Sequence, residues 1–599
     1  MSSLIRTNQL VYTLNYEEID KKYDIFVVQT TEKYFRYGAY ILDAPILEGN
    51  VCSVCFLNGK EFYVLMYHNE QNKKLLKEAL FNAKGGDTVI LRSLKSKELK
   101  NRSLLQLLLN SLGSIKHPSL RFNNLTGHLY CFHPDWIDES KGIIWKVPCL
   151  ELKLTSEYHL KLDVCTFTSV RLKNKITFKN QKFEDYPKYV LSMAHKTLRR
   201  KLKDDKEPAF IKRQVDGEKS SIDYLNILNF QAFSRSKMGI LAETVLHFNE
   251  VFKNMAYIDF EAVSEYDSLN DTKENKNFIK EKLQIQEIRI VDMIGDESSK
   301  KFCKEMKEHL FEEYQITVKI GKRPDKNCLN LCLIHEASYY HGKDDPHQKQ
   351  YPDTAIQHIT LENFADNVKY ATSTVIHELL IKSDLQDRKI RLFDWSKLGL
   401  TEDISFGIAE NIEENVEHYF FMCIHPDGTF FIEEQEPILF EQIEYSQCTE
   451  IFSEPKNNPQ DFRGIIRDNH GNINIIDDTD LITIPEIFDL RQELENGNTK
   501  LRNGKKRELL LPSVTDIRYF QKNGNIYYFS GVIGYGMKPD VHTAMHIRKV
   551  KPYEDAPLFF EKLLPLMNVR FVRNKQLTVY PFPFKYLREH LQQLKNNLK

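Results

Sequence analysis

The stretch that decides the fold reads IRIVDMIGDESSKKFCKEMKEHLFEEY, residues 288–314. Its apolar start predicts a short strand that ends at Asp292. From Ser298 onward, apolar residues recur at the i, i+4, i+8 and i+9 positions, which predicts a helix that buries one face. We expect this face to consist of Phe302, Met306, Leu310 and Phe311.

The chain continues with three more apolar runs and a second helical pattern. Alternating apolar residues predict a strand over residues 316–320, and an almost unbroken apolar run predicts a buried strand over residues 329–334. Residues 355–359 predict a fourth strand, and residues 367–381 predict a helix. This order of elements indicates a parallel or mixed sheet with helices packed against it. Such sheets bind ligands beyond the carboxyl ends of their strands.

A polar loop, residues 336–353, follows the third strand and contains Tyr339 and, four residues later, Lys343. Gln357 lies 14 residues beyond Lys343, and Lys382 lies 25 residues beyond Gln357. Two ammonium groups, an amide and a phenol at one edge of a sheet would bind an anion, and the aromatic ring would stack on a base. The alternative interpretation is a solvated loop with scattered charges.

In their order and spacing, these four residues resemble the guide 5′-phosphate pocket in the MID domain of Argonaute proteins. The family usually has another basic residue one helical turn before the last lysine, where this chain has Glu378. The resemblance extends more loosely from about Leu160 to the C-terminus. It implies an α/β multidomain fold, with a Rossmann-like MID domain and an RNase H-like PIWI domain preceded by an α+β N-terminal region. It leaves open a Mg²⁺ ion at the 5′-phosphate and implies no other cofactor. The matching residues are Tyr339, Lys343, Gln357 and Lys382.

At 599 residues the chain is too long for one core, so three or four domains are expected. Its 83 Lys and Arg against 84 Asp and Glu give a net charge of −1, which confines any nucleic-acid site to a local patch or channel. Cys52 and Cys55 have the spacing of zinc ligands but lie in an apolar run, which favours core residues. The chain start does not resemble a signal peptide, and no apolar run is long enough to cross a membrane. We therefore expect a cytoplasmic protein with no membrane partner.

Patterns and resemblance together divide the chain into four expected parts. These are an α+β N-terminal domain over residues 1–150, a linker region with a basic segment over 151–282, a MID-like domain over 283–390 and a PIWI-like domain over 391–599. The linker region is too short for a full PAZ domain, the family's guide 3′-end binder. The resemblance therefore implies that a PAZ domain is absent or reduced.

Two basic segments are candidates for contact with a nucleic-acid backbone. In residues 188–213, a helical period would place Lys196, Arg200 and Lys203 along one stripe, which suits a phosphate backbone. A solvated helix face is the alternative.

The second basic segment, residues 570–588, interleaves cations with aromatic rings, as in proteins that follow a single strand. In the family the chain end packs near the MID pocket, so the resemblance implies that Arg573 and Lys585 help to hold guide phosphates. A core strand followed by an amphipathic terminal helix is the alternative.

The resemblance also raises the question of whether the chain cuts nucleic acid. An RNase H-type nuclease needs three or four acids around two divalent ions. The family's first aspartate follows a glycine and an apolar residue on a strand, but here the sequence is FGIA and ends at Ala409, which cannot bind a metal. Asp477 or Asp478 could occupy a second strand-end position. We therefore expect no catalytic residues. A competing alignment rebuilds an acidic set from Asp394, Glu434, Asp468 and Asp540.

The function implied by the resemblance is guide-dependent recognition of nucleic acid without cutting. The expected partners are a short guide RNA or DNA, a complementary target and an effector protein that acts in defence against plasmids or phage. Two alternatives remain open: an active guided endonuclease that uses two metal ions, and a nucleic-acid-binding interaction module with a vestigial pocket.

Overall fold

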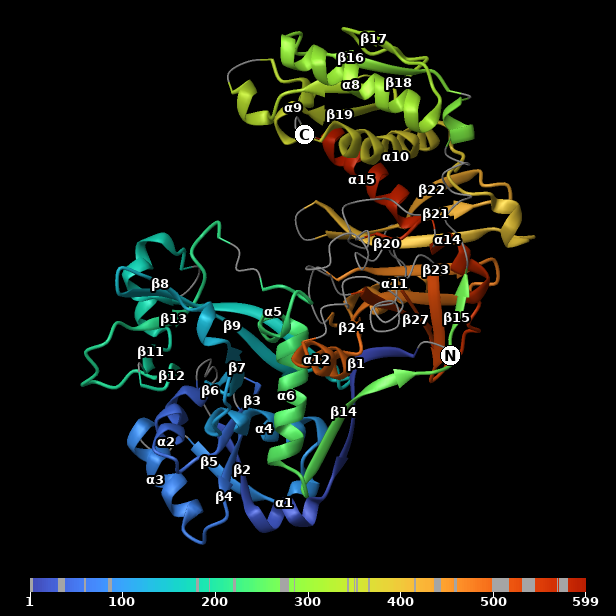
Figure 1. The fold of residues 1–599 in the computed structure, drawn as a ribbon. Helices are drawn as coiled ribbons and strands as arrows, with labels where there is room; N and C mark the ends of the chain where they lie inside the picture. Colours follow the sequence, from blue (N-terminus) through green and yellow to red (C-terminus); the bar gives the residue numbers. More distant parts are fainter. Residues whose placement is uncertain are drawn as a thin grey trace. The chain divides into compact units, whose positions relative to one another are not determined.

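A computed structural model shows a multidomain, mixed α/β protein with antiparallel sheets, a parallel four-stranded sheet and a near-closed β-barrel. The chain divides into two units (Figure 1). Unit 1 comprises Met1–Ser264, Asp480–Pro512 and Tyr535–Ala544, and unit 2 comprises Glu265–Thr479, Ser513–Gly534 and Met545–Lys599. The structure describes residues 4–30, 38–58, 61–84, 89–178, 182–192, 194–218, 222–269, 280–284, 286–341, 344–349, 351, 354–364, 367–413, 416–435, 443–456, 461–497, 517–529, 545–567, 569 and 580–598.

Unit 1 begins with a four-stranded antiparallel sheet in the strand order β3-β4-β2-β5 (blue in Figure 1). Alternate apolar residues of its strands share one core with Leu76 and Leu80 of helix α3. Residues 38–42 form a 3-10 turn between β2 and α2. The elements are α1 (Tyr16–Lys22), β2 (Tyr23–Thr30), η1 (Gly38–Leu42), α2 (Asp43–Leu47), β3 (Ser53–Asn58), β4 (Glu61–Tyr67), α3 (Asn72–Lys84), β5 (Val89–Leu94) and α4 (Asn101–Ser111).

The next strands of unit 1 curl into the near-closed barrel, in the order β12-β11-β13-β10-β9-β7-β6. The end strands β12 and β6 lie next to each other, and the backbone N–H of Leu198 on β12 donates to Asn123 Oδ1 on β6 at 2.8 Å. Strand β9 runs through residue 150, where the sequence had suggested a domain boundary. The strands are β6 (Arg121–Leu125), β7 (His128–Phe132), β8 (Asp138–Ser140), β9 (Ile143–Leu154), β10 (Leu160–Ser169), β11 (Tyr189–Ser192), β12 (Thr197–Arg200) and β13 (Phe210–Lys212).

The basic segment of residues 188–213 is not the helix that the sequence predicted. It forms the hairpin β11-β12 and then strand β13. The prediction was wrong because the segment has few apolar residues, and the many cations around them concealed the strands. Lys196, Arg200 and Lys203 therefore do not share a helical stripe. The buried residues of this segment are Tyr189, Val190, Leu191, Leu198, Ala209, Phe210 and Ile211.

A helix pair, an antiparallel pair of strands and helix α12 complete the described part of unit 1. Between Tyr224 and Phe252 the chain forms two helices, α5 and α6, and the hydroxyl of Ser236 caps the second helix by accepting from the Gly239 N–H at 3.2 Å. Strand β1 pairs with β14 along most of its length and with the last residues of β24. The elements are β1 (Ile5–Leu14), α5 (Phe230–Ser234), α6 (Lys237–Val251), β14 (Ala256–Val263) and α12 (Ile487–Glu495).

Unit 2 contains the predicted parallel sheet, in the strand order β17-β16-β18-β19. Every residue of β18 is buried, as its unbroken apolar run predicted. Helix α8 buries Phe302, Met306 and Leu310, but Phe311 is 56% exposed because it lies about 100° around the helix from Leu310. Helix α10 packs against α8, β18 and β19. The elements are β16 (Ile288–Asp292), α8 (Glu297–Tyr314), β17 (Lys319–Gly321), β18 (Leu329–Ile334), β19 (Ile356–Thr360) and α10 (Val368–Asp387).

A long sheet, in the order β15-β25-β26-β27-β24-β23-β20-β21-β22, forms the rest of unit 2. Helix α15 packs on it, with the ring of Phe584 edge-on to Phe406 at 5.4 Å between centroids. The sequence analysis missed β23, whose short apolar centre lies between arginines, and helix α11. The elements are β15 (Asp267–Leu269), β20 (Ile404–Glu413), β21 (Val416–Ile424), β22 (Phe430–Gln435), α11 (Ile443–Ser453), β23 (Arg463–Asp468), β24 (Ile473–Ile484), β25 (Ile517–Lys522), β26 (Asn525–Phe529), β27 (Met545–Pro552) and α15 (Phe584–Leu598).

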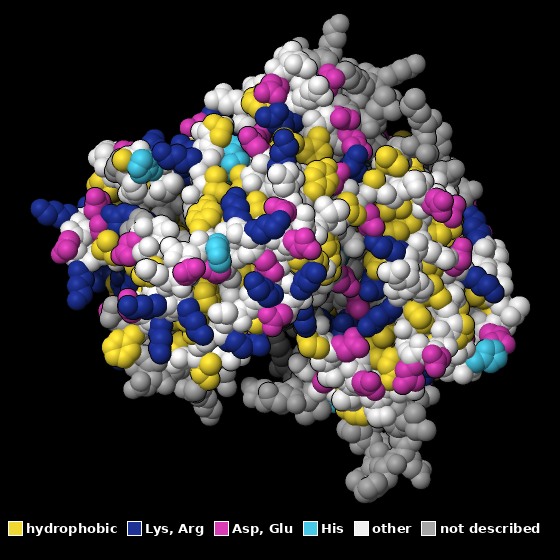
Figure 2. All heavy atoms as spheres, turned by 90° about the horizontal axis from the view of Figure 1, so that it is seen from below, with side chains coloured by type: hydrophobic (Ala, Val, Ile, Leu, Met, Phe, Trp, Pro, Cys, Tyr) yellow, Lys and Arg dark blue, Asp and Glu magenta, His cyan; other side chains and the backbone are white. Residues whose placement is uncertain are grey.

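Among the described helices, none combines the length and the apolar character needed to span a membrane. Acidic and basic side chains are interspersed over much of the face shown in Figure 2, in keeping with the net charge of −1.

Candidate functional site

Gln357 and Lys382 lie close together at the start of strand β19. The Lys382 ammonium donates to the carbonyl of Ile356 at 2.8 Å, and Gln357 Nε2 donates to Glu378 Oε2 at 2.9 Å. Glu378 lies one helical turn before Lys382 on α10. Strand β19 and helix α10 thus bring an amide, an ammonium and a carboxylate into one group.

Helix α15 places an ion pair near this group. Lys585 and Glu589 pair at 2.8 Å, and their side chains are only 15% and 9% exposed. Burial lowers the pKa of Lys382, whereas the nearby carboxylates of Glu589 and Glu378 act to raise it. We call the set Gln357, Glu378, Lys382, Lys585 and Glu589 the lysine–glutamate site.

His358, the residue after Gln357, supplies a buried nitrogen beside the lysine–glutamate site. Burial, together with the charge of Lys382 and the neighbouring His347, lowers the pKa of His358 to about 4, so its ring is neutral at neutral pH. The Nε2 atom of His358 is buried and has no hydrogen-bond partner among the described residues. A buried polar atom without a partner is costly, and a ligand could satisfy it.

A series of rings connects His358 to Tyr339. The ring centroids of His358 and His347 lie 5.8 Å apart, those of His347 and Tyr340 5.9 Å, and those of Tyr340 and Tyr339 5.2 Å. Tyr339 lies in the 3-10 turn η7 (Ala337–Tyr340) after β18 and is 48% exposed. The side chain of His335 packs on it at 3.9 Å between centroids.

The structure therefore brings two of the four expected pocket residues, Gln357 and Lys382, into one group and places Tyr339 at the far end of the ring series. Lys343 lies outside the described residues. The sequence analysis did not identify the roles of His358 and Glu589. His358 directly follows Gln357, and Glu589 lies four residues beyond Lys585 on one helix face, which are the signals that could have found them.

A cavity of about 370 Å³ in unit 1 is lined largely by the barrel strands. Tyr130 meets Phe167 edge-on, with ring centroids 5.2 Å apart, and Phe167 meets Tyr189 edge-on at 5.7 Å. The lining residues are Phe56, Thr126, His128, Tyr130, Phe167, Tyr186, Pro187, Tyr189, Lys212 and Arg213. We call this the barrel cavity.

Two cations of the barrel cavity lie over its rings. The Lys212 ammonium lies 4.7 Å from the centroid of Tyr130 and donates to its hydroxyl at 2.9 Å. Arg213 lies 5.2 Å from the centroid of Tyr186 and donates to its hydroxyl at 2.6 Å. Rings that stack on bases, combined with cations that bind phosphate, are the means by which proteins hold single-stranded nucleic acid.

Buried carboxylates hold the barrel cavity's polar groups in place. Burial tends to raise the pKa of Glu151, but hydrogen bonds and charge from His128 and Lys212 outweigh it and lower the pKa to about 2. Asp43 accepts a hydrogen bond from the Tyr189 hydroxyl at 3.1 Å, and its burial raises its pKa to about 7. The sequence analysis missed this cavity because its lining residues extend from Phe56 to Arg213 and only the strand register brings them together.

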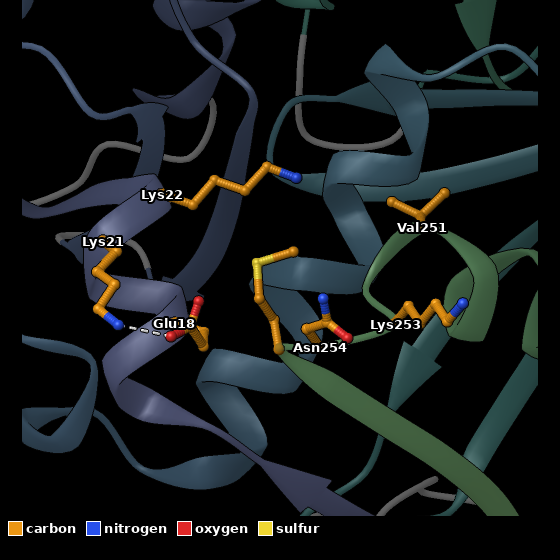
Figure 3. Close-up of a pocket in the computed structure, with 7 residues that line it drawn as sticks. Glu18, Lys21, Lys22, Val251, Lys253 and Asn254 are labelled. Carbon is orange, nitrogen blue, oxygen red and sulfur yellow. Dashed lines mark hydrogen bonds and ion pairs between the residues drawn. The ribbon is translucent and has the colours of Figure 1, made fainter.

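A third hollow, of about 360 Å³, lies in unit 1 beside the end of α1 and the turn after α6 (Figure 3). Its cations are Lys21, Lys22 and Lys253, and Lys21 pairs with Glu18 at 2.6 Å. All three lysines lie at or just beyond helix C-termini, where carbonyl groups attract cations. Helix capping accounts for them, and we assign this hollow no ligand.

The expected backbone-contacting residues have different surroundings. Arg200 donates to the carbonyls of Tyr40 and Ile41 at 3.1 and 3.2 Å and lies 4.3 Å from the ring centroid of Tyr40, so it supports the barrel's packing. Lys196, at the tip of the β11-β12 hairpin, and Lys203 are exposed. Lys585 belongs to the lysine–glutamate site, and Arg573 lies outside the described residues.

The acids of the competing nuclease alignment serve local roles where the structure describes them. Asp394 caps a 3-10 turn, Glu434 pairs with His418, and Asp468 accepts hydrogen bonds from the turn that follows it. Asp540 lies outside the described residues. Within the described part of the chain, no group of three His, Cys, Asp or Glu side chains is arranged to hold a metal ion.

Ala409 lies on strand β20 opposite Tyr419 of β21. Asp477 pairs with Arg463 at 2.6 Å, and Asp478 pairs with the buried Arg548 at 2.6 Å. Arginine thus neutralises Asp477 and Asp478, and the third aspartate of β24, Asp480, pairs with Lys161 at 2.8 Å.

A comparison with protein-family models found no match, and a search of the curated proteins found none either.

Proposed function

We propose that this protein binds a short single strand of nucleic acid as a guide, without cutting, and presents it to a complementary target. The observation that carries the proposal is the barrel cavity, in which Lys212 and Arg213 lie over tyrosine rings. Its aromatic walls suit a base and its cations suit a phosphate. This cavity takes one end of the strand, which gives the barrel the role of the PAZ domain that the sequence had suggested was absent or reduced.

The other end of the strand, a 5′-phosphate, binds at the lysine–glutamate site. Support comes from the amide of Gln357, the ammonium of Lys382 and the buried, unpartnered Nε2 of His358. The order of the parallel sheet and the spacing of these residues resemble the MID domain of Argonaute proteins.

The finer assignment of the second sheet to an RNase H-like PIWI domain is part of the same proposal. The antiparallel pairing of β23 with β20 does not by itself support this assignment. The proposal therefore depends on the two binding sites and not on this sheet.

Because no cutting site is found among the described residues, we expect the bound strand to act through another protein. Ala409 and the arginine-paired Asp477 and Asp478 support a protein that recognises but does not cleave. An effector protein recruited after target pairing would then act against plasmid or phage nucleic acid. Base pairing supplies the specificity and the protein holds the backbone.

The test is a titration of the full chain with a fluorescent 5′-phosphorylated single strand. Replacing Lys382 by Met removes one buried cation from the phosphate site, so affinity should fall about tenfold or more. Lys369→Met is the matched control, because Lys369 lies on the same helix but is 73% exposed, and it should leave affinity unchanged. Equal affinity for all three proteins would overturn the phosphate site, and no binding by the unmodified chain would overturn the function.

A further inference from the structure

The lysine–glutamate site already contains its own anions. The carboxylate of Glu378 accepts the hydrogen bond that Gln357 Nε2 donates, and the carboxylate of Glu589 accepts from Lys585. Taken as a whole residue, Glu589 is 7% exposed, so its charge is poorly screened by water. Both carboxylates act on the charge of Lys382.

Summed over the site, the charges cancel. Lys382 and Lys585 contribute two positive charges, and Glu378 and Glu589 contribute two negative ones. A phosphate that enters such a site meets directed donors but no excess of positive charge. The phosphate also meets the carboxylate of Glu378, which already accepts the hydrogen bond of the Gln357 amide.

We propose that Glu378 is a specificity-determining residue. In the ligand-free protein its carboxylate accepts the hydrogen bond of the Gln357 amide, and the terminal phosphate of a strand must displace it. Glu378 thereby weakens the binding of phosphorylated ends relative to hydroxyl ends. This inference rests on the proposed function, because it concerns the same 5′-end site.

The physical reason is repulsion between like charges at close range. A phosphate within hydrogen-bond reach of Gln357 also approaches the Glu378 carboxylate, which lies 2.9 Å from that amide. Juxtaposed like charges at an interface oppose binding and discriminate between partners. Glutamine at position 378 keeps the shape and the hydrogen-bonding capacity of the side chain but removes the repulsion.

The experiment compares two single strands of one sequence, one with a 5′-phosphate and one with a 5′-hydroxyl. The measured quantity is the ratio of the two dissociation constants, hydroxyl over phosphate. We expect Glu378→Gln to raise this ratio about tenfold at low salt, and less at high salt because exposed charge is then screened. Glu312→Gln, an exposed carboxylate on α8 whose removal changes the net charge equally, should leave the ratio unchanged.

The ratio of the dissociation constants distinguishes a change in specificity from a loss of structure, since a variant with a loosened fold would bind both strands more weakly. Glu589→Gln provides a second variant that should also raise the ratio. A preference for phosphate in the unmodified chain that neither variant increases would overturn the inference and leave the proposed function standing. If neither the unmodified chain nor the variants prefer the phosphorylated strand, the inference and the proposed function are both refuted. A preference for the phosphorylated strand that appears only in Glu378→Gln supports the inference.

Discussion

The hydroxyl of Tyr586 on helix α15 donates to Asp384 on helix α10 at 2.8 Å, in a fully buried contact. Asp384 also accepts from the backbone N–H of Arg391 at 2.8 Å. Burial nevertheless dominates and raises the pKa of Asp384 to about 7. The contact holds helix α15 against helix α10, which carries Lys382. It therefore stabilises the arrangement of the lysine–glutamate site.

This buried carboxyl predicts a pH dependence of stability. Because the pKa of Asp384 is raised in the folded chain, the folded state takes up a proton between pH 7 and 4 that the unfolded state does not. Asp384 therefore stabilises the fold increasingly as the pH falls through 7, by at most about 1.4 kcal/mol per pH unit. The free energy of unfolding of the unmodified chain minus that of Asp384→Asn should rise as the pH is lowered from 8 to 5. Glu312→Gln, which removes an exposed carboxylate on helix α8, is the control, and a flat difference for Asp384→Asn would refute the assignment.

Arg200 is predicted to matter for stability more than for binding. Lysine at this position cannot reproduce two carbonyl hydrogen bonds while stacking on Tyr40, so Arg200→Lys should cost about 1–3 kcal/mol in chemical unfolding. Lys196→Ala and Lys203→Ala remove exposed side chains and should change stability by less than about 0.5 kcal/mol. If these two lysines contact a phosphate backbone, their loss reduces the salt dependence of strand binding. The reverse pattern, with Arg200→Lys stable but weakly binding, would place Arg200 at the nucleic acid instead.

The barrel cavity is predicted to lose affinity for a strand when Lys212 is removed. Lys212→Ala deletes the cation over Tyr130, and we expect about a tenfold loss of affinity for a single strand. Lys146→Ala is the matched control, because Lys146 lies on strand β9 of the same barrel and pairs with Glu218 outside the cavity. A loss that is equal in the two variants would show a general charge effect and not a site.

No guided cutting is predicted for the unmodified chain. Strand-loaded protein should leave a complementary target intact in Mg²⁺ or Mn²⁺, because Ala409 offers no ligand and Arg463 and Arg548 pair with Asp477 and Asp478. The measurement is gel analysis of an end-labelled target. A cut at a fixed distance from the strand's end would support the acidic set with Asp394 instead.

Strands β16, β18 and β19 of the parallel sheet could be predicted from sequence because each has a strong local pattern. The strand predicted over residues 316–320 was misplaced, because β17 begins at Lys319 and Ile320 is exposed. The run from Leu329 to Ile334 is apolar throughout, and helix α8 repeats its buried residues at helical spacing. The spacing of apolar residues along the chain was sufficient to predict these elements without knowledge of long-range contacts. Phe311 was misplaced because it adjoins the buried Leu310 in sequence yet lies on the solvent side.

The barrel and its cavity could not be predicted in this way. Strand β12 reads TLRR, and its single buried Leu198 gives no period against the surrounding cations. The cavity depends on the register that sets Tyr130, Phe167 and Tyr189 against one another, and register is a property of the folded sheet. Gln357 and Lys382 were found because their spacing resembled a known pocket, whereas no spacing marked Asp43 or Tyr189.

The central claim, that the chain carries a guide strand with a phosphate at its 5′ end, is tested most directly by extracting nucleic acid from the purified protein and sequencing and end-labelling it. We predict short single strands of narrow length that accept a labelled 5′-phosphate only after phosphatase treatment. The yield should fall in a Lys382→Met, Lys212→Ala double variant. Recovery of no nucleic acid, or of fragments with random lengths and 5′-hydroxyl ends in equal amounts from both proteins, would contradict the account.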